Sequence, residues 1–244
     1  QRQMCIRDSV FTSCEPIGVV AAVVPWNAQM FLTATKLAPA LAAGCTIIIK
    51  ASEIAPCSLL YFARLIKEAG IPDGVVSVIT GDEKNCAIPL TTHPDIDRIA
   101  FTGGPKVAKQ IVINSSENFA VTTLELGGKS PIVVFEDADI EGAVNGIIAG
   151  NYGASGQSCV AGTRVIVHDS IKKVLVEMLS KRAESIVTGD PKNNETHVGP
   201  LCTNKQINLI EKTLKKAKSQ GAKIVFGGSR LNQKGYYFEP TLID

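Results

Sequence analysis

A cysteine and a glutamate, each close to glycines, are the two residues of this sequence best suited to covalent chemistry. Cys159 ends the stretch Gly156-Gln157-Ser158-Cys159, where the glycine lets a substrate approach the thiol closely. Glu125 lies in Leu124-Glu125-Leu126-Gly127-Gly128, an apolar setting that favours a desolvated carboxylate acting as a general base. Together the two residues predict a reaction that forms a thioester on the cysteine and then hydrolyses it.

Both residues also have an ordinary structural interpretation. A glutamate on an edge strand commonly points at solvent, and a free cysteine is commonly a small buried apolar side chain. The glycines and polar residues around Cys159 favour a nucleophile there, and the strength of the Glu125 signal lies in the pair. Burial is the expectation for the remaining cysteines, Cys5, Cys14, Cys45, Cys57, Cys86 and Cys202.

Three further motifs directly follow apolar runs. Asn27 comes after Val23-Val24-Pro25-Trp26, where its amide could donate to a developing oxyanion or merely cap a helix. In Phe101-Thr102-Gly103-Gly104-Pro105-Lys106, two glycines before a helix could seat a phosphate or pyrophosphate. Lys50-Ala51-Ser52-Glu53 follows a strand and could hold ribose hydroxyls. For the last two motifs an ordinary loop is the alternative.

Composition excludes several classes of protein and site. The net charge of +2 gives no sign of a nucleic-acid partner, and no apolar run is long and uninterrupted enough to span a membrane. Seven irregularly spaced cysteines without a CxxC pair, and only three histidines, disfavour a disulfide scaffold and a metal site. The cysteine usage fits a reducing compartment, so a cytoplasmic location is expected.

The elements that must position these motifs alternate between short apolar strands and amphipathic helices. Buried strands are predicted over 19–24, 46–49, 75–79, 98–101 and 121–126, and helices over 31–43, 57–69 and 106–113. Gly44 and Gly70 follow two of these helices and are typical stop signals. Repeated strand–helix–strand units of this length predict an α/β fold with a parallel sheet covered on both faces.

The alternation resumes after Gly127-Gly128. Strands are predicted over 132–135, 164–167 and 222–226, an extended end over 236–243, and helices over 140–149, 170–186 and from 203 to about 220. Asp137 or Asp139 is expected to cap the first of these helices, and Thr203 with Gln206 the last. The predicted domain boundary lies at Gly127-Gly128, between the proposed base and the proposed nucleophile.

With these motifs in this order, the chain resembles the NAD(P)-dependent aldehyde dehydrogenase superfamily. The resemblance runs from about Val10 to the end and rests most firmly on the motifs around Glu125 and Cys159. It implies a parallel Rossmann-like cofactor-binding domain over 10–127 and an α/β catalytic domain over 128–244.

The resemblance also implies catalytic roles. Cys159 would attack the aldehyde carbonyl to give a thiohemiacetal, while the Asn27 amide and the Cys159 backbone N–H form an oxyanion hole. Hydride transfer to the nicotinamide would leave a thioester, and Glu125 would activate the water that releases the carboxylic acid.

The implied cofactor is NAD, with NADP as the alternative. Lys50 and Glu53 would hold the adenosine ribose, and a carboxylate at Glu53 would repel a 2′-phosphate. Gly103 and Gly104 would let the dinucleotide approach the helix. The residues expected to contact the cofactor are Trp26, Lys50, Ser52, Glu53, Gly103, Gly104 and Leu126.

The sequence also departs from the family pattern. Family members are about twice as long, and this chain stops before their Glu-x-Phe-Gly-Pro segment, so we expect a fragment that turns over poorly alone. The first nine residues, Gln1 to Ser9, match nothing downstream and are interpreted as a non-native leader. Gly104 stands where many relatives have serine.

Three other functions stay open. A CoA-acylating semialdehyde dehydrogenase is disfavoured because such enzymes typically lack the glutamate found at Glu125. A hydrolase or acyltransferase using Cys159 would need a histidine partner, which no motif supplies. A truncated, non-catalytic homologue is the third. The expected partners are a small aldehyde and further subunits in a homodimer or homotetramer, with neither nucleic acid nor membrane.

Overall fold

In the computed structural model, residues 12–244 are described. The chain divides into two compact units, Gln1–Leu126 and Gly127–Asp244, and each is described by itself. The predicted leader over 1–9 and the predicted domain start at residue 10 lie outside the described residues. The predicted boundary between residues 127 and 128 lies beside the division between the units.

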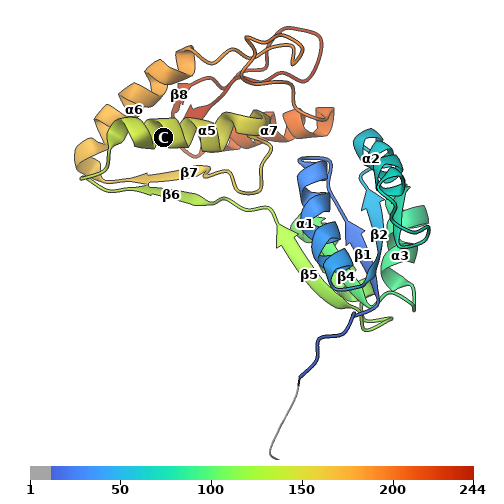
Figure 1. The fold of residues 1–244 in the computed structure, drawn as a ribbon. Coiled ribbons are helices and arrows are strands. Elements are labelled where there is room, and N and C mark those ends of the chain that lie inside the picture. The colour runs from blue at the N-terminus through green and yellow to red at the C-terminus, as the bar shows by residue number, and fades with distance from the viewer. Residues whose placement is uncertain (1–11) are drawn as a thin grey trace, which may run out of the picture. The chain divides into compact units, whose positions relative to one another are not determined.

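The first unit is built on a five-stranded sheet in the order β3-β2-β1-β4-β5 (Figure 1). Every neighbouring pair of strands in this sheet is parallel, which confirms the expected α/β fold. The strands are β1 Val19–Val23, β2 Thr46–Ala51, β3 Val76–Thr80, β4 Arg98–Gly103 and β5 Val121–Leu126.

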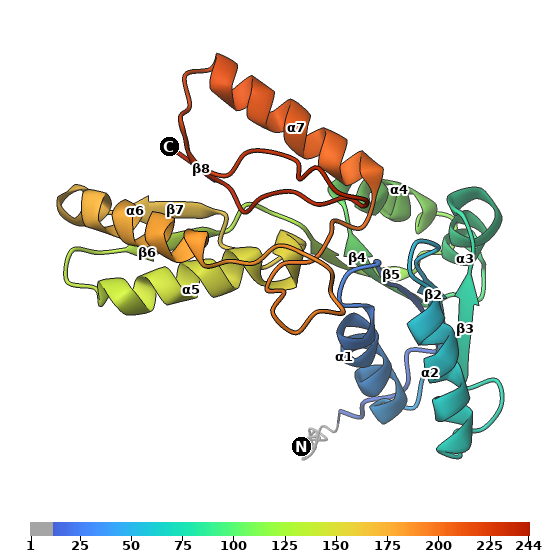
Figure 2. The ribbon, with the colours of Figure 1, turned by 90° about the horizontal axis from the view of Figure 1, so that it is seen from above.

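Helices cover both faces of this sheet, as the uninterrupted apolar strands predict. Val20 and Ala22 of β1 pack with α1 and α2, whereas Ala21 and Val23 pack with α3 and α4. Figure 2 shows the two pairs of helices on opposite sides of the strands. The helices are α1 Gln29–Ala42, α2 Cys57–Glu68, α3 Ile88–Thr92 and α4 Pro105–Asn114.

The second unit has two small sheets. Strands β6 Pro131–Val134 and β7 Arg164–Val167 pair in parallel, and β8 Ile224–Phe226 pairs antiparallel with β9 Leu242–Ile243. Its helices are α5 Ile140–Tyr152, α6 Asp169–Glu184 and α7 Asn204–Ser219, together with the short turn η2 Gly153–Gly156. The core between β6, α5 and α6 consists of Val134, Val144, Ile147, Leu175 and Leu179.

The structure contains the predicted side-chain caps of helices α5 and α7. Asp139, and not Asp137, caps α5 by accepting a hydrogen bond from the Glu141 backbone N–H at 3.2 Å. Thr203 Oγ1 accepts from the Gln206 N–H at 3.3 Å at the start of α7. Gly44, Gly70 and Gly221 follow their helices with positive φ, a conformation that suits glycine.

The structure differs from the sequence prediction in two places. A π-helical turn, η1 Glu83–Ala87, and the short helix α3 lie between β3 and β4, where no element is predicted. The predicted extended end over 236–243 is a strand only at Leu242–Ile243, with one isolated bridge from Phe238 to Arg230. Pro240 has no N–H to donate, which is one reason why this segment does not form a continuous ladder. Among the helices of residues 12–244, none is both long and apolar enough to cross a bilayer.

Candidate active site

The parallel sheet brings the predicted site residues of the first unit to the carboxyl ends of its strands. Because its strands all run in the same direction, their carboxyl ends lie together. Asn27 follows β1, Lys50 lies near the end of β2, Gly104 follows β4, and Glu125 is the penultimate residue of β5. The register places Glu125 beside Thr102 and Leu126 beside Gly103.

The strand order reverses between β1 and β4, in the middle of the sheet. The chain passes from β1 to β2 and β3 on one side and returns to β4 and β5 on the other. In open α/β sheets, ligands bind outside the carboxyl ends of strands at such a reversal. Trp26 and Asn27, after β1, and Gly104, after β4, flank that position.

The amino end of α4 is open to a ligand. Gly104 is its N-cap residue, no side chain caps the helix, and Pro105 occupies the first turn. A Cβ added at Gly104 would meet nothing within 4 Å, so the backbone there is uncovered. Gly103 differs, because a Cβ there would collide with the ring of Phe101. The structure therefore gives Gly103 a packing reason for being glycine.

Lys50 and Glu53 form an ion pair at the end of β2. The Lys50 Nζ lies 2.8 Å from Glu53 Oε2, and Lys50 is buried whereas the Glu53 carboxylate is half exposed. Partial burial acts to raise the pKa of Glu53, but the hydrogen bond from Lys50 and its positive charge outweigh that effect and lower it. Ser52 is also buried, and its hydroxyl accepts a weak hydrogen bond from the Ile54 N–H at 3.4 Å.

Glu125 does not occupy the desolvated setting that its apolar neighbours predict. It is exposed, and within the described residues β5 is the last strand of the sheet and pairs with β4 alone. This part of the prediction is wrong. A lysine that the sequence analysis missed lies close by instead.

Lys36 reaches the carboxyl end of the sheet from α1. Its Nζ donates to Thr102 Oγ1 at 2.6 Å, and Thr102 on β4 is the direct register partner of Glu125 on β5. Burial lowers the pKa of Lys36, and the negative charge of Glu125 partly opposes that effect. A helical signal was present in the sequence, because Lys36 lies between the buried positions Thr33 and Ala40 on the face of α1 that packs on the sheet.

Cys159 belongs to the second unit, where it follows α5 and the turn η2. The cysteine is half-buried, and the next residue, Val160, is 80% exposed. Two residues of the turn, Ala154 and Ser155, have positive φ angles of 50° and 54°. Of the other cysteines within the described residues, only Cys45 is buried, while Cys14 and Cys57 are exposed and Cys86 and Cys202 are intermediate. Their expected burial is therefore mostly wrong.

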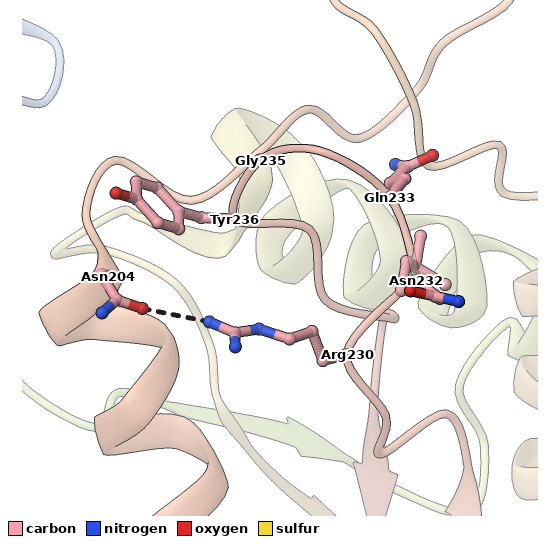
Figure 3. Close-up of a pocket in the computed structure, with 7 residues that line it drawn as sticks. Asn204, Arg230, Asn232, Gln233, Gly235 and Tyr236 are labelled. Carbon is pink, nitrogen blue, oxygen red and sulfur yellow. Dashed lines mark hydrogen bonds between the residues drawn. The ribbon is translucent and has the colours of Figure 1, made fainter.

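A separate pocket of about 540 Å³ in the second unit contains none of the predicted site residues. Figure 3 shows that Arg230 and Asn204 meet at its wall, where the Arg230 Nη2 donates to Asn204 Oδ1 at 3.1 Å. Arg230 also lies 3.9 Å from the carboxylate of Glu211. Since that carboxylate already balances the charge of the guanidinium, we assign this pocket no ligand.

Comparison with known proteins supplies a family match. Residues 3–244 match the model of the aldehyde dehydrogenase family. A curated relative, (Z)-2-((N-methylformamido)methylene)-5-hydroxybutyrolactone dehydrogenase of Acinetobacter baylyi, is 54% identical over 230 residues, which cover 94% of this chain and 47% of the relative. The chloroplastic betaine aldehyde dehydrogenase of Atriplex hortensis is 42% identical over 94% of this chain and 46% of its own length.

Solved structures give the same result. PnpE in complex with nicotinamide adenine dinucleotide matches with a TM-score of 0.91 and 43% identity, over 94% of this chain and 48% of that chain. Betaine aldehyde dehydrogenase of Staphylococcus aureus in complex with NAD+ matches with a TM-score of 0.90 and 38% identity, over 94% of this chain and 46% of that chain. The chain thus spans about half the length of the curated relatives and structures that it matches.

Proposed function

The chain belongs to the aldehyde dehydrogenase family, and from this membership we propose that it serves the NAD-dependent oxidation of an aldehyde to a carboxylic acid. The observation that carries the proposal is that Asn27, Lys50, Gly104 and Glu125 all lie at the carboxyl end of the parallel sheet. Dinucleotides bind at the carboxyl ends of the strands in open α/β sheets.

The residues at this end of the sheet fit a dinucleotide. The uncapped amino end of α4, with open space beside Gly104, can receive a pyrophosphate through backbone N–H groups. The Lys50–Glu53 pair offers one donor and one acceptor for ribose hydroxyls. Trp26, Ser52, Gly103 and Leu126 are proposed as further contacts on the same grounds of position. When bound, NAD supplies an acceptor for the hydride that leaves the aldehyde carbon.

The ion pair also bears on the choice between NAD and NADP. Because the pKa of Glu53 is lowered, its carboxylate is charged at neutral pH. A negative charge at the ribose seat repels a 2′-phosphate, which supports NAD over NADP.

Cys159 is the proposed nucleophile. Its thiolate adds to the aldehyde carbonyl, and the resulting oxyanion is stabilised by hydrogen bonds from the Asn27 side-chain amide and the Cys159 backbone N–H. Loss of hydride from this thiohemiacetal leaves a thioester on the cysteine. The position of the half-buried cysteine, shortly after the turn η2 and next to the 80% exposed Val160, supports this role, because a substrate can approach it.

Glu125 is the proposed general base for hydrolysis. It takes a proton from a water molecule, which then attacks the thioester and releases the acid. The presence of this glutamate keeps CoA-acylating chemistry as the weaker alternative.

A cysteine hydrolase receives little support. The ring of His168 contacts Ser170 Oγ and lies near Glu136, and His197 Nδ1 accepts from the Val187 backbone N–H. Within residues 12–244, no hydrogen bond joins a histidine to Cys159.

The remaining expectations form part of the same proposal. They are a small aldehyde as substrate, assembly as a homodimer or homotetramer, and a cytoplasmic location. Some relatives are named as chloroplastic or peroxisomal enzymes, so location has to be tested separately.

Trapping the acyl intermediate tests the function directly. The Glu125→Gln variant is incubated with NAD and a panel of aliphatic, aromatic and quaternary-ammonium aldehydes, and Cys159 is examined by peptide mass spectrometry. We expect an acyl adduct on Cys159 that requires NAD and is absent from Cys159→Ser. A single turnover suffices for detection, so slow turnover does not hide the result. If aldehyde and NAD together leave the mass of the Cys159 peptide unchanged, the proposed function is wrong.

A further inference from the structure

The turn η2, which ends three residues before Cys159, contains consecutive left-handed residues. Ala154 has φ 50° and ψ 33°, Ser155 has φ 54° and ψ 34°, and Gly156 has φ 69°. The left-handed conformation suits Gly156 but is unfavourable for residues with a Cβ. Two such residues in succession persist only where surrounding contacts hold them.

Two long-range hydrogen bonds supply those contacts. Ser155 Oγ accepts from the Gly199 N–H at 3.0 Å, and Gln157 Oε1 accepts from the Cys202 N–H at 2.9 Å. The donors lie 44 and 45 residues further along the chain. The turn is thus attached, on both sides of Gly156, to one short segment, Gly199–Cys202.

That segment is itself fixed. Leu201 is buried in the core beside α7, and its N–H donates to the Tyr236 carbonyl at 2.9 Å. Thr203, the next residue after Cys202, caps α7. A side chain bonded to this segment is therefore connected to the core of the unit.

A third contact closes the loop from its other side. Asn151 Nδ2 donates to the carbonyls of Ile147, in α5, and Gly162, beyond the cysteine, both at 3.0 Å. The end of α5 and the far end of the loop are thereby joined. Of the loop's side chains, Ser155 and Gln157 are the two that accept hydrogen bonds from the Gly199 and Cys202 backbone N–H groups.

We propose that Ser155 and Gln157 are positioning residues that orient the Cys159 thiol by holding the left-handed turn against Gly199–Cys202. This inference rests on the proposed role of Cys159 as nucleophile. Neither residue needs to touch the substrate. Their effect is on the direction in which the thiol and the adjacent backbone N–H groups point, on which attack at a carbonyl depends.

Two reagents separate orientation from access. p-Nitrophenyl acetate acylates a thiol through attack at a carbonyl, whereas iodoacetamide alkylates any thiol that it can reach. The measured quantity is the ratio of acylation to alkylation rate constants at Cys159, read by peptide mass spectrometry without NAD or aldehyde. Cys14 and Cys57, both exposed, serve as internal standards in the same chain.

Loss of either acceptor should lower this ratio. We expect Ser155→Ala and Gln157→Ala each to reduce it about 5- to 30-fold, the range that corresponds to one lost hydrogen bond. Gln157→Glu keeps an acceptor oxygen and should restore most of the ratio, and Ser155→Gly should restore part of it because glycine favours the turn. Ser180→Ala removes a serine hydroxyl bonded only within α6 and should leave the ratio unchanged.

The outcomes distinguish the two levels of the proposal. An unchanged ratio in Ser155→Ala and Gln157→Ala, or no recovery in Gln157→Glu, would overturn the positioning roles alone. A wild-type Cys159 that is acylated no faster than Cys57 would overturn the proposed nucleophile, and the positioning roles with it. Thermal unfolding of each variant identifies any that fail to fold, and Gln157→Glu then decides the question for Gln157.

Discussion

The two units hold their proposed site residues by different means. In the first unit, Lys50 and Glu125 lie within paired parallel strands, where the regular hydrogen bonds of the sheet align them, and Asn27 follows β1. In the second unit, Cys159 follows a left-handed turn whose flanking side chains accept hydrogen bonds from residues more than forty positions away. Lys50 and Glu125 are thus placed by regular structure, whereas the turn before the proposed nucleophile is joined to the rest of its unit by specific long-range contacts.

The difference has one exception that makes it instructive. Ala28, immediately after Asn27, is also left-handed, with φ 47° and ψ 32°. Both the proposed oxyanion donor and the proposed nucleophile therefore have a strained alanine nearby, although their units are otherwise built differently. Local backbone strain is commonly retained where it serves a site.

The largest expected effect comes from removing the thiol of the second unit. Cys159→Ala should abolish acyl-adduct formation and leave the affinity for NAD unchanged, because the proposed cofactor contacts belong to the first unit. Peptide mass spectrometry and calorimetric titration with NAD measure the two properties. Cys57→Ala, at an exposed position of α2, is the matched control. A parallel loss of NAD binding in Cys159→Ala would show that the two units do not divide the work in this way.

The second-largest effect is expected from removing the proposed general base, Glu125, in the first unit. Glu125→Gln should slow hydrolysis of the thioester by about 10²–10⁴-fold, the usual contribution of a general base, while acylation continues. The lifetime of the adduct after removal of aldehyde measures this. If acylation slows as much as hydrolysis, Glu125 acts on the nucleophile and not on water.

An effect of about tenfold is expected at the ribose seat. Glu53→Gln should raise the affinity for NADP relative to NAD by about tenfold, because one repulsive charge is removed in a partly screened position. Titration calorimetry with both dinucleotides gives the ratio. Because the pKa of Glu53 is lowered, its carboxylate is charged in the neutral buffers in which both titrations are carried out. Glu68→Gln, which alters an exposed ion pair on α2, should change neither value.

A few-fold effect is expected from relieving the strain in each unit. Ala154→Gly and Ala28→Gly should each stabilise the protein by about 1 kcal/mol, because glycine adopts the left-handed conformation without a steric penalty. Urea unfolding followed by circular dichroism measures the change. Destabilisation by both substitutions would mean that the cost of the left-handed residues has been misjudged.

The smallest effect concerns the lysine that reaches the carboxyl end of the sheet. The pKa of Lys36 lies below its ordinary value of 10.5, so the unfolded chain binds more protons than the folded one between the two values. Stability contributed by Lys36 should therefore rise with pH across that alkaline window, relative to Lys36→Met. Urea unfolding at several alkaline pH values tests the sign.

The sequence predicts most of the regular elements because their signals are local. Apolar runs such as Val19–Val23 and stop signals such as Gly44 depend only on nearby residues. The exposed setting of Glu125 differs from the desolvated one that its apolar neighbours predict, because the burial of a strand residue depends on which other segments pack on its face, and these lie elsewhere in the chain. The bonds from Ser155 and Gln157 escape sequence reading for a similar reason, since nothing near them names their partners.

The position of β1 at the middle of its sheet has a consequence for how the chain folds as it is synthesised. β1 pairs with β2 soon after both strands emerge, but its other neighbour, β4, begins only at Arg98. Until then one side of a wholly apolar strand has no partner, and such unpaired edges invite aggregation. Synthesis must therefore continue for about 75 residues beyond the end of β1, from Val23 to Arg98, before this strand can be paired on both sides.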